Sequence, residues 1–185
     1  MTRRVAFLDR DGVINVDTGY VHRWDDFRFL EGAIEAMQHL SKRNIGMVIV
    51  TNQAGIARGL YSEKQYVELR GRMLAHLEAV GVSLMGVYHC PHHIDGVVPA
   101  FAINCDCRKP KPGMLLRAAR ELSIDLDTSF LIGDQLTDIQ AAHAAGVKKA
   151  YLIQTSLQTG EMQTSPCPTY TSLWQCVQHI DSQLY

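Results

Sequence analysis

Residues 5–12 read VAFLDRDG: four apolar residues, then two carboxylates one residue apart, then a glycine. A short apolar run that ends abruptly in polar residues is typical of a strand buried in a parallel sheet. Four further runs resemble it, and helix-like segments lie between them. We therefore predict an α/β fold, a Rossmann-like parallel sheet with helices on both faces. The other predicted strands are GMVIV at 46–50, GVY at 86–88, FLI at 130–132 and AYLI at 150–153.

Two of the helices can be placed in more detail. Ser62 followed by Gln65 is a capping-box pattern that marks a helix start. A final helix is predicted after a connection rich in Ser, Thr and Pro at residues 155–169. Both helices have an apolar stripe that we interpret as core. The stripes are Tyr66, Leu69, Met73 and Leu77 in the first helix, and Leu173, Val177, Ile180 and Leu184 in the last.

Length and charge limit the possible functions. The 185 residues predict one domain spanning residues 1–185. Eighteen Lys and Arg against nineteen Asp and Glu give a net charge of -1, so we expect no broad basic surface for nucleic acid or a membrane. The apolar run before Asp9 is too short for a signal-peptide core, and no later run reaches membrane-spanning length. We expect a cytoplasmic protein and, since nothing in the sequence demands a partner subunit, a monomer.

Polar side chains follow the predicted strands at the edge where open α/β sheets bind ligands. Asp9 follows the first strand and Asp134 the fourth, while Thr51 and Asn52 follow the second. Lys109 lies in a loop just before another predicted helix. A single carboxylate at a strand end is equally well explained as a cap or turn residue. Because several separate segments converge here, we favour a functional site.

The residue types at this edge suit a phosphoryl group held beside Mg²⁺. Asp9, Asp11 and Asp134 offer the oxygen ligands that Mg²⁺ prefers. Lys109 offers a positive charge and Thr51 a hydroxyl, and the turns at Gly12 and Gly55 can present backbone N–H groups to an anion. The sequence therefore predicts a magnesium-dependent phosphoryl-binding pocket.

The paired carboxylates of DRD predict two chemical roles. Asp9 can be the nucleophile that takes the phosphoryl group, and Asp11 can protonate the departing alcohol and later deprotonate the attacking water. Their spacing lets alternate side chains of an extended strand end point the same way, and Gly12 permits the turn that follows.

With these residues in place, the chain resembles the haloacid-dehalogenase-like (HAD-like) phosphohydrolases. DRDGV at residues 9–13 is similar to the first motif of that family, VIVTN at 48–52 to the second, Lys109 to the third and GDQLTD at 133–138 to the fourth. Within the family, the segments GYVHRWDDFRFLEGA, VTNQAGIARG, CPHH and CDCRKPKPGM resemble the heptose 1,7-bisphosphate 7-phosphatases up to about residue 153.

The resemblance implies a role for each matching residue. It implies a phosphatase in which Asp9 is the nucleophile, Asp11 the acid and base, and Thr51 and Lys109 stabilise the phosphoryl group. Mg²⁺ would be held by the Asp9 side chain, the Asp11 carbonyl and Asp134. Gln135 departs from the family, which carries a lysine there, so affinity or anomer preference is expected to differ. The implied substrate contacts, for a small phosphosugar, are Asp17, Thr18, Gly19, Tyr20, Thr51, Asn52, Gln53, Ala54, Arg108 and Lys109.

A cluster of cysteine and histidine predicts a second metal site. Cys90, His92, Cys105 and Cys107 offer three thiolates and an imidazole, the ligands of a structural Zn²⁺. The spacing alone leaves free thiols possible and makes His89 and His93 rival ligands. The resemblance implies a zinc-bound loop with the first four residues. Such a zinc ion would fix the loop that leads to Arg108 and Lys109, and would not activate water.

Residues 13–50 separate the first two motifs, which is enough for a small flap and one helix but no large cap domain. The pocket is therefore expected to be open to a small substrate.

Two alternative functions stay open. Histidinol-phosphate phosphatases share the fold, the zinc loop and the four motifs. A phospho-receiver signalling domain also gathers acids, Thr and Lys around Mg²⁺, but it has no need of a leaving-group acid such as Asp11.

Overall fold

The computed structural model describes residues 3–154 and 167–182. Its described strands form one six-stranded sheet in the order β3-β2-β1-β4-β5-β6, and every pairing is parallel. The first strand is thus central, with β2 on one side and β4 on the other. The strands are β1 (Val5–Leu8), β2 (Gly46–Asn52), β3 (Gly86–Cys90), β4 (Phe130–Gly133), β5 (Lys149–Ile153) and β6 (Thr169–Tyr170).

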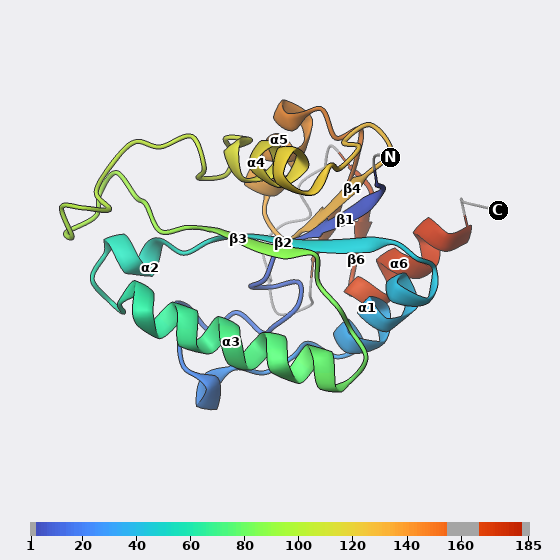
Figure 1. The fold of residues 1–185 in the computed structure, drawn as a ribbon, viewed down its shortest axis with the longest axis horizontal. Coiled ribbons are helices and arrows are strands. Elements are labelled where there is room, and N and C mark those ends of the chain that lie inside the picture. The colour runs from blue at the N-terminus through green and yellow to red at the C-terminus, as the bar shows by residue number, and fades with distance from the viewer. Residues whose placement is uncertain (1–2, 155–166, 183–185) are drawn as a thin grey trace.

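Helices cover the two faces of this sheet, as Figure 1 shows. Helices α4 (Gly113–Leu122) and α5 (Leu136–Ala145) lie on one face, and α1 (Ala33–Lys42), α3 (Glu63–Ala79) and α6 (Leu173–Ser182) lie on the other. A separate apolar core fills each interface. The short helix α2 (Ala54–Ala57) lies beside the carboxyl ends of the strands. The 3-10 turn η1 (Trp24–Asp26) lies beneath α3 in this view. The predicted Rossmann-like α/β fold is confirmed.

Local sequence explains the longest helix. The Ser62 hydroxyl accepts a hydrogen bond from the Gln65 backbone N–H at 3.2 Å, and the Gln65 side chain accepts one from the Ser62 N–H at 2.8 Å. This is the predicted capping box, and it satisfies backbone donors that a helix start leaves free. The predicted apolar stripe of Tyr66, Leu69, Met73 and Leu77 is buried.

The strand predictions hold in position and differ in length. Strands β2 and β3 run two residues beyond the apolar runs, to Asn52 and Cys90, because parallel pairing between the two continues there. The two-residue β6 was not predicted, since so short a strand has no periodicity to detect. In the last helix Leu173, Val177 and Ile180 are buried. Leu184 and most of the 155–169 connection lie outside the described residues.

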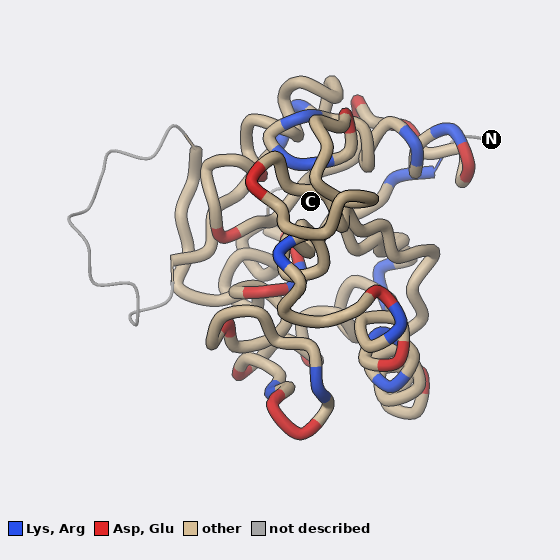
Figure 2. The backbone as a smooth tube through the Cα atoms, turned by 90° about the vertical axis from the view of Figure 1, so that its left-hand side faces the viewer, with Lys and Arg blue, Asp and Glu red and all other residues tan. Residues whose placement is uncertain are grey.

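Between β1 and β2 the chain forms only the η1 turn, α1 and their connections, so the carboxyl ends of the strands have no large cap over them. Basic and acidic residues are interspersed over the face shown in Figure 2 and form no continuous band of one sign. Within the described residues, no helix combines the length and the apolar character that crossing a membrane requires.

Candidate active site

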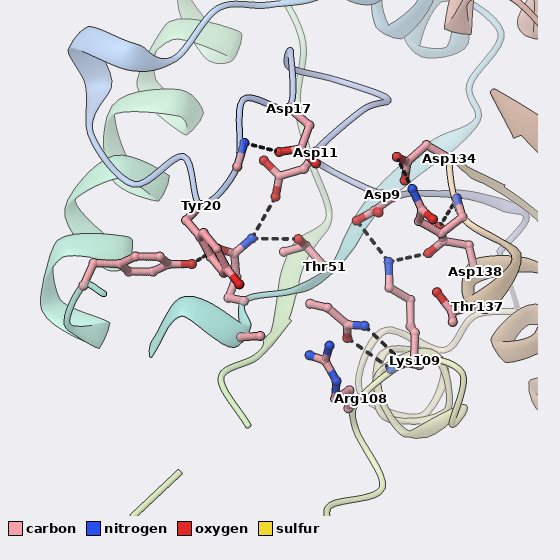
Figure 3. Close-up of a pocket in the computed structure, with 16 residues that line it drawn as sticks. Asp9, Asp11, Asp17, Tyr20, Thr51, Arg108, Lys109, Asp134, Thr137 and Asp138 are labelled. Carbon is pink, nitrogen blue, oxygen red and sulfur yellow. Dashed lines mark hydrogen bonds and ion pairs between the residues drawn. The ribbon is translucent and has the colours of Figure 1, made fainter. Parts of the chain in front are cut away.

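A pocket of about 330 Å³ opens at the carboxyl ends of β1, β2 and β4 (Figure 3). Its volume lies at the lower end of the usual range for small-molecule sites. All the sequence-predicted catalytic and substrate residues line it except Thr18. Thr18 lies in an exposed turn that Asp17 closes by accepting a hydrogen bond from the Gly19 N–H at 2.8 Å, and its contact with substrate stays a prediction. The lining residues are Asp9, Asp11, Asp17, Gly19, Tyr20, Thr51, Asn52, Gln53, Ala54, Tyr61, Arg108, Lys109, Asp134, Gln135, Thr137 and Asp138.

Lys109 is the charged centre of the pocket floor. Its Nζ lies 3.0 Å from Asp9 Oδ1 and 2.5 Å from Asp138 Oδ1, and it donates to the Val50 carbonyl at 2.8 Å. Burial by itself would lower the pKa of Lys109, but the Asp138 and Asp9 carboxylates outweigh it and raise the pKa. The ammonium group is therefore charged at neutral pH. It can lie beside an anionic phosphoryl group attached at Asp9.

The Lys109 backbone is held by Asn52, which comes from the end of β2. The Asn52 amide donates to the Lys109 carbonyl at 3.1 Å, and the Asn52 side-chain oxygen accepts from the Lys109 N–H at 3.1 Å. Asn52 was predicted to contact substrate. It does line the pocket, but its two hydrogen-bonding groups are directed at Lys109.

Asp9 lies directly after β1, and its N–H donates to the Ile132 carbonyl of β4 at 3.0 Å. Its carboxylate accepts from the Arg10 N–H at 2.8 Å. Burial raises the pKa of Asp9 well above its usual value, while the neighbouring Lys109 opposes this rise. The cationic partner therefore favours the charged form of Asp9, against the effect of burial.

Three buried carboxylates, Asp9, Asp134 and Asp138, place oxygen atoms close enough to share one cation. Burial raises the pKa of Asp134 to about 6, and the hydrogen bond that the Gln135 amide donates at 3.0 Å partly offsets this rise. Gly12 is the neighbour that allows this arrangement. It has φ +78°, and a Cβ there would overlap the Asp134 carboxylate.

Asp11 departs from the expected geometry. Strand β1 ends at Leu8, so the DRD segment is not extended and Asp11 does not point the same way as Asp9 (Figure 3). The Asp11 carboxylate forms a bidentate ion pair with buried Arg10, with Arg10 Nη2 at 2.8 Å from Oδ1. Asn15 donates to Oδ1 at 3.0 Å, and Gln53 to Oδ2 at 3.1 Å. Asp11 lines the pocket next to the carboxylate cluster, but its side chain lies outside that cluster.

Gln53 links Asp11 to the second motif. Its amide nitrogen also donates to the Thr51 hydroxyl at 2.9 Å, and its oxygen accepts a hydrogen bond from Tyr61 at 2.6 Å. The Tyr61 ring stacks on His22 at 4.7 Å between centroids. Thr51 is buried at the end of β2 with its hydroxyl at the pocket wall.

Four lining residues were not predicted as site residues: Tyr61, Gln135, Thr137 and Asp138. A signal for Asp138 was present, because it lies four residues after Asp134 in the first turn of α5. Its carboxylate accepts from the Gln135 N–H at 3.0 Å. Tyr61 had no such signal, since it reaches the pocket from the connection between α2 and α3.

The structure brings Cys90, His92, Cys105 and Cys107 together at one point, apart from the carboxylate cluster. The three Sγ atoms lie 3.0 to 3.5 Å from one another, and His92 Nδ1 lies 3.3 Å from Cys107 Sγ. Tetrahedral zinc with thiolate bonds needs sulfur atoms about 3.8 Å apart, so these four groups fit a zinc ion after small shifts. The rival ligand His89 is instead bonded to Glu63 at 3.1 Å.

The thiols of Cys90 and Cys107 have opposite pKa shifts. The hydrogen bond between Cys90 and Cys107 lowers the pKa of Cys107 to about 5, and that same interaction, together with burial, raises the pKa of Cys90. This cluster therefore already favours a thiolate, the form that binds zinc. The segment that it closes contacts α2, because the Val97 and Val98 N–H groups donate to the Ala57 carbonyl at 2.8 and 2.9 Å.

Comparison with known proteins assigns the chain to a family. It is 54% identical over 150 residues to the D-glycero-beta-D-manno-heptose-1,7-bisphosphate 7-phosphatase of Photorhabdus laumondii, covering 81% of this chain and 80% of the relative. The chain belongs to the heptose 1,7-bisphosphate 7-phosphatase family. Its similarity to the alpha-anomer enzyme of the same organism is lower, at 44% over 158 residues, with 85% of this chain and 86% of that protein covered.

Structural comparison agrees with this family. A crystal structure of D,D-heptose 1.7-bisphosphate phosphatase from B. bronchiseptica, complexed with magnesium and phosphate, has a TM-score of 0.83 and 31% identity to this chain. It covers 97% of this chain and 99% of that one. The HAD-hydrolase-like family model matches residues 106–173, which include the third and fourth motifs. Because the chain belongs to a family of hydrolases, the alternative of a phospho-receiver signalling domain is discarded.

Proposed function

We propose that this heptose bisphosphate phosphatase family member removes the 7-phosphate of D-glycero-β-D-manno-heptose 1,7-bisphosphate. The observation that carries the proposal is the open pocket in which buried Asp9 lies 3.0 Å from Lys109, in a chain 54% identical to a β-anomer enzyme. The weaker similarity to an α-anomer enzyme supports a preference for the β anomer. The 1-phosphate would remain for nucleotide activation toward ADP-heptose and lipopolysaccharide core.

The carboxylate cluster fits Mg²⁺, since its donors are buried oxygens next to an open pocket. Asp9 and Asp134 would hold the ion through their side chains and Asp11 through its backbone carbonyl. When bound, the ion supplies positive charge that neutralises the phosphoryl oxygens. Asp138 is nearest to Lys109 and would hold that ammonium group in place, because the pair is buried.

The proposed reaction has two steps, both carried by residues of this chain. An Asp9 carboxylate oxygen forms a bond to phosphorus, the bond from phosphorus to the sugar oxygen breaks, and Asp11 gives that oxygen a proton. Water then attacks the phosphorus of the Asp9 aspartyl phosphate, and Asp11 takes the proton of that water. The bond between phosphorus and the Asp9 oxygen breaks, so phosphate leaves and the Asp9 carboxylate is restored. The Lys109 ammonium and the Thr51 hydroxyl stabilise the phosphoryl oxygens in both steps.

The outer pocket would hold the sugar and its second phosphate. Asp17, Gly19 and Tyr20 form one wall, and Gln53 and Ala54 form another. Arg108 would bind the phosphate group that is not hydrolysed, since it is the lining cation outside the buried floor. With four protein ligands, a zinc ion at the cysteine cluster would be structural and would fix the loop that leads to Arg108.

Turnover of purified protein tests the substrate directly. Both heptose bisphosphate anomers, fructose 1,6-bisphosphate and histidinol phosphate are compared with Mg²⁺ present. We expect the highest kcat/KM for the β anomer, and a higher value for histidinol phosphate would promote that alternative. Asp9→Asn should abolish measurable turnover, because uncatalysed phosphate monoester hydrolysis is slower than the enzymatic reaction by as much as ~10²¹. Retained turnover in that variant contradicts the proposed nucleophile.

A further inference from the structure

The pocket wall carries more negative than positive charge. Among its lining residues Lys109 and Arg108 are the basic ones, and Lys109 is committed to Asp9 and Asp138 at the floor. A phosphate monoester carries about 1.5 to 2 negative charges at neutral pH. In the outer pocket the lining would therefore offer the unhydrolysed phosphate one guanidinium, that of Arg108. The lining carboxylates are Asp9, Asp11, Asp17, Asp134 and Asp138.

A second guanidinium, that of Arg58, contacts a side chain that lines the pocket. Arg58 is exposed at the end of α2, and its Nη1 donates to the Tyr20 hydroxyl at 2.6 Å. Tyr20 lines the pocket and is 42% exposed, so its hydroxyl and the Arg58 group lie at the pocket rim. Figure 3 shows the Tyr20 ring and Arg108 on the same side of the pocket, away from Asp134.

Arg58 and Arg108 flank one short segment, the pair His92 and His93. Arg58 Nη2 lies 3.3 Å from His93 Nε2, and Arg108 Nη1 donates to the His92 carbonyl at 3.4 Å. Two cationic side chains from separate elements therefore contact the same two-residue segment.

Neither guanidinium is neutralised by an acidic partner. Within residues 3–154 and 167–182, no carboxylate oxygen lies within 4.0 Å of the nitrogens of Arg58 or Arg108. Arg10, in contrast, donates from both Nε and Nη2 to the Asp11 carboxylate. A guanidinium has five N–H donors, so Arg58 keeps free donors while it is bonded to Tyr20. Unpaired arginines at a pocket mouth are suited to bidentate recognition of phosphate.

The backbone that carries the two arginines is held by one segment. Ala57, directly before Arg58, accepts the backbone bonds from Val97 and Val98, and its own N–H donates to the Pro91 carbonyl at 3.2 Å. The same segment continues through Cys107 to Arg108. The backbone positions of the two arginines relative to each other are therefore held by a single piece of chain.

We propose that Arg58 and Arg108 together bind the phosphate group that is not hydrolysed, which makes Arg58 a determinant of bisphosphate specificity. This inference rests on the proposed function for the choice of substrate. A competing role for Arg58 is only to hold Tyr20 in place, and the two roles differ in which substrates and which variants lose activity.

The test compares heptose 1,7-bisphosphate with heptose 7-phosphate, which keeps the reacting phosphate and lacks the other. For Arg58→Gln we expect KM for the bisphosphate to rise about 10- to 100-fold, the usual effect of losing a charged hydrogen bond. Its kcat on the bisphosphate, and kcat/KM for the 7-phosphate, should stay within about twofold. Arg58→Lys should recover part of the loss, and Arg72→Gln, at an exposed arginine of α3, should have no effect.

Tyr20→Phe separates the two roles, because it removes the acceptor of Arg58 and leaves the charge. It should cost much less than Arg58→Gln. An equal loss in the two variants, or an equal loss on the two substrates, overturns direct phosphate binding by Arg58. Titration calorimetry with heptose 1-phosphate gives a readout without turnover, and Arg58→Gln should weaken its binding about tenfold or more. If the wild type turns over the bisphosphate and Arg58→Gln has the same kinetics, this inference alone is overturned. If the wild type does not turn over the bisphosphate, the proposed function is overturned.

Discussion

Asn52 and Lys109 are joined by two reciprocal hydrogen bonds of 3.1 Å, although 57 residues separate them in the chain. The Asn52 side chain binds both the N–H and the carbonyl of Lys109, as a neighbouring strand would. Through these two bonds the end of β2 fixes the Lys109 backbone, from which the lysine side chain extends. The ammonium group is then placed between Asp9 and Asp138.

Asn52→Ala should lower kcat/KM by about 10- to 100-fold, since two hydrogen bonds worth about 1 kcal/mol each position Lys109. Steady-state kinetics measure the loss. Asn52→Asp keeps the acceptor for the Lys109 N–H but loses the donor to its carbonyl, so its effect should be smaller than that of alanine. Gln140→Ala, at an exposed amide of α5, is the control and should be neutral. Wild-type kinetics in Asn52→Ala would contradict the positioning role.

Asp11→Asn should slow turnover of the sugar phosphate by about 10² to 10⁴, the usual contribution of general acid catalysis. An alkoxide leaving group needs the proton more than a stabilised phenolate does, so an activated aryl phosphate should lose less. Rates on both substrates are measured for the wild type and the variant. Equal losses on the two would remove the acid role from Asp11.

Magnesium binding should weaken as pH falls through about 6, because the pKa of Asp134 is raised by burial to about 6 and a proton then competes with the cation. Without the cation the raised pKa means that the folded state binds this proton more tightly than the unfolded chain. The contribution of Asp134 to stability is therefore present at pH 4 and is lost as pH rises through about 6.

Thermal unfolding at pH 5 to 8, with and without Mg²⁺, measures both effects. The Mg²⁺-induced rise in Tm should be small near pH 5 and reach its full size above about pH 7. Asp134→Asn should remove most of this rise at every pH. A rise in Tm that is independent of pH in the wild type would contradict the role of Asp134 as the titrating ligand.

Replacing Cys105 or Cys107 by serine should remove zinc from the protein. Metal analysis of the wild type should find about one zinc per chain, the number that a site with four protein ligands holds. The Tm of each variant should also fall, since structural zinc contributes directly to folding. Cys176→Ala, at a buried cysteine of α6 outside the cluster, should keep its zinc. Unchanged zinc content in the serine variants would rule out this site.

The sequence predicted the fold because its central strands are short apolar runs with abrupt polar ends. It also placed Asp9, Thr51, Lys109 and Asp134 at one edge, since parallel strands direct their carboxyl ends the same way. The direction of individual side chains was less accessible. The pairing of Asp11 with Arg10 depends on a turn that begins as soon as β1 ends.

Residues that reach the pocket from loops were the hardest to predict. Tyr61 carries no motif of its own and becomes informative only when its partner Gln53 is seen. Arg58 lies in the family-like segment VTNQAGIARG, but it was not singled out until its contact with Tyr20 was seen. Thr18 does not line the pocket although its neighbours Asp17 and Gly19 do, because a sequence does not show which residues of a turn reach a pocket.

The strand order has a consequence for how the chain is made. Strand β1 lies between β2 and β4 in the finished sheet, and its neighbour Phe130–Gly133 is synthesised more than a hundred residues after it. Until then one edge of VAFL has unsatisfied backbone groups and an apolar surface, the conditions under which nascent strands associate wrongly. Asp9 therefore exists in the growing chain long before Lys109 and Asp138, the groups that surround it in the folded pocket.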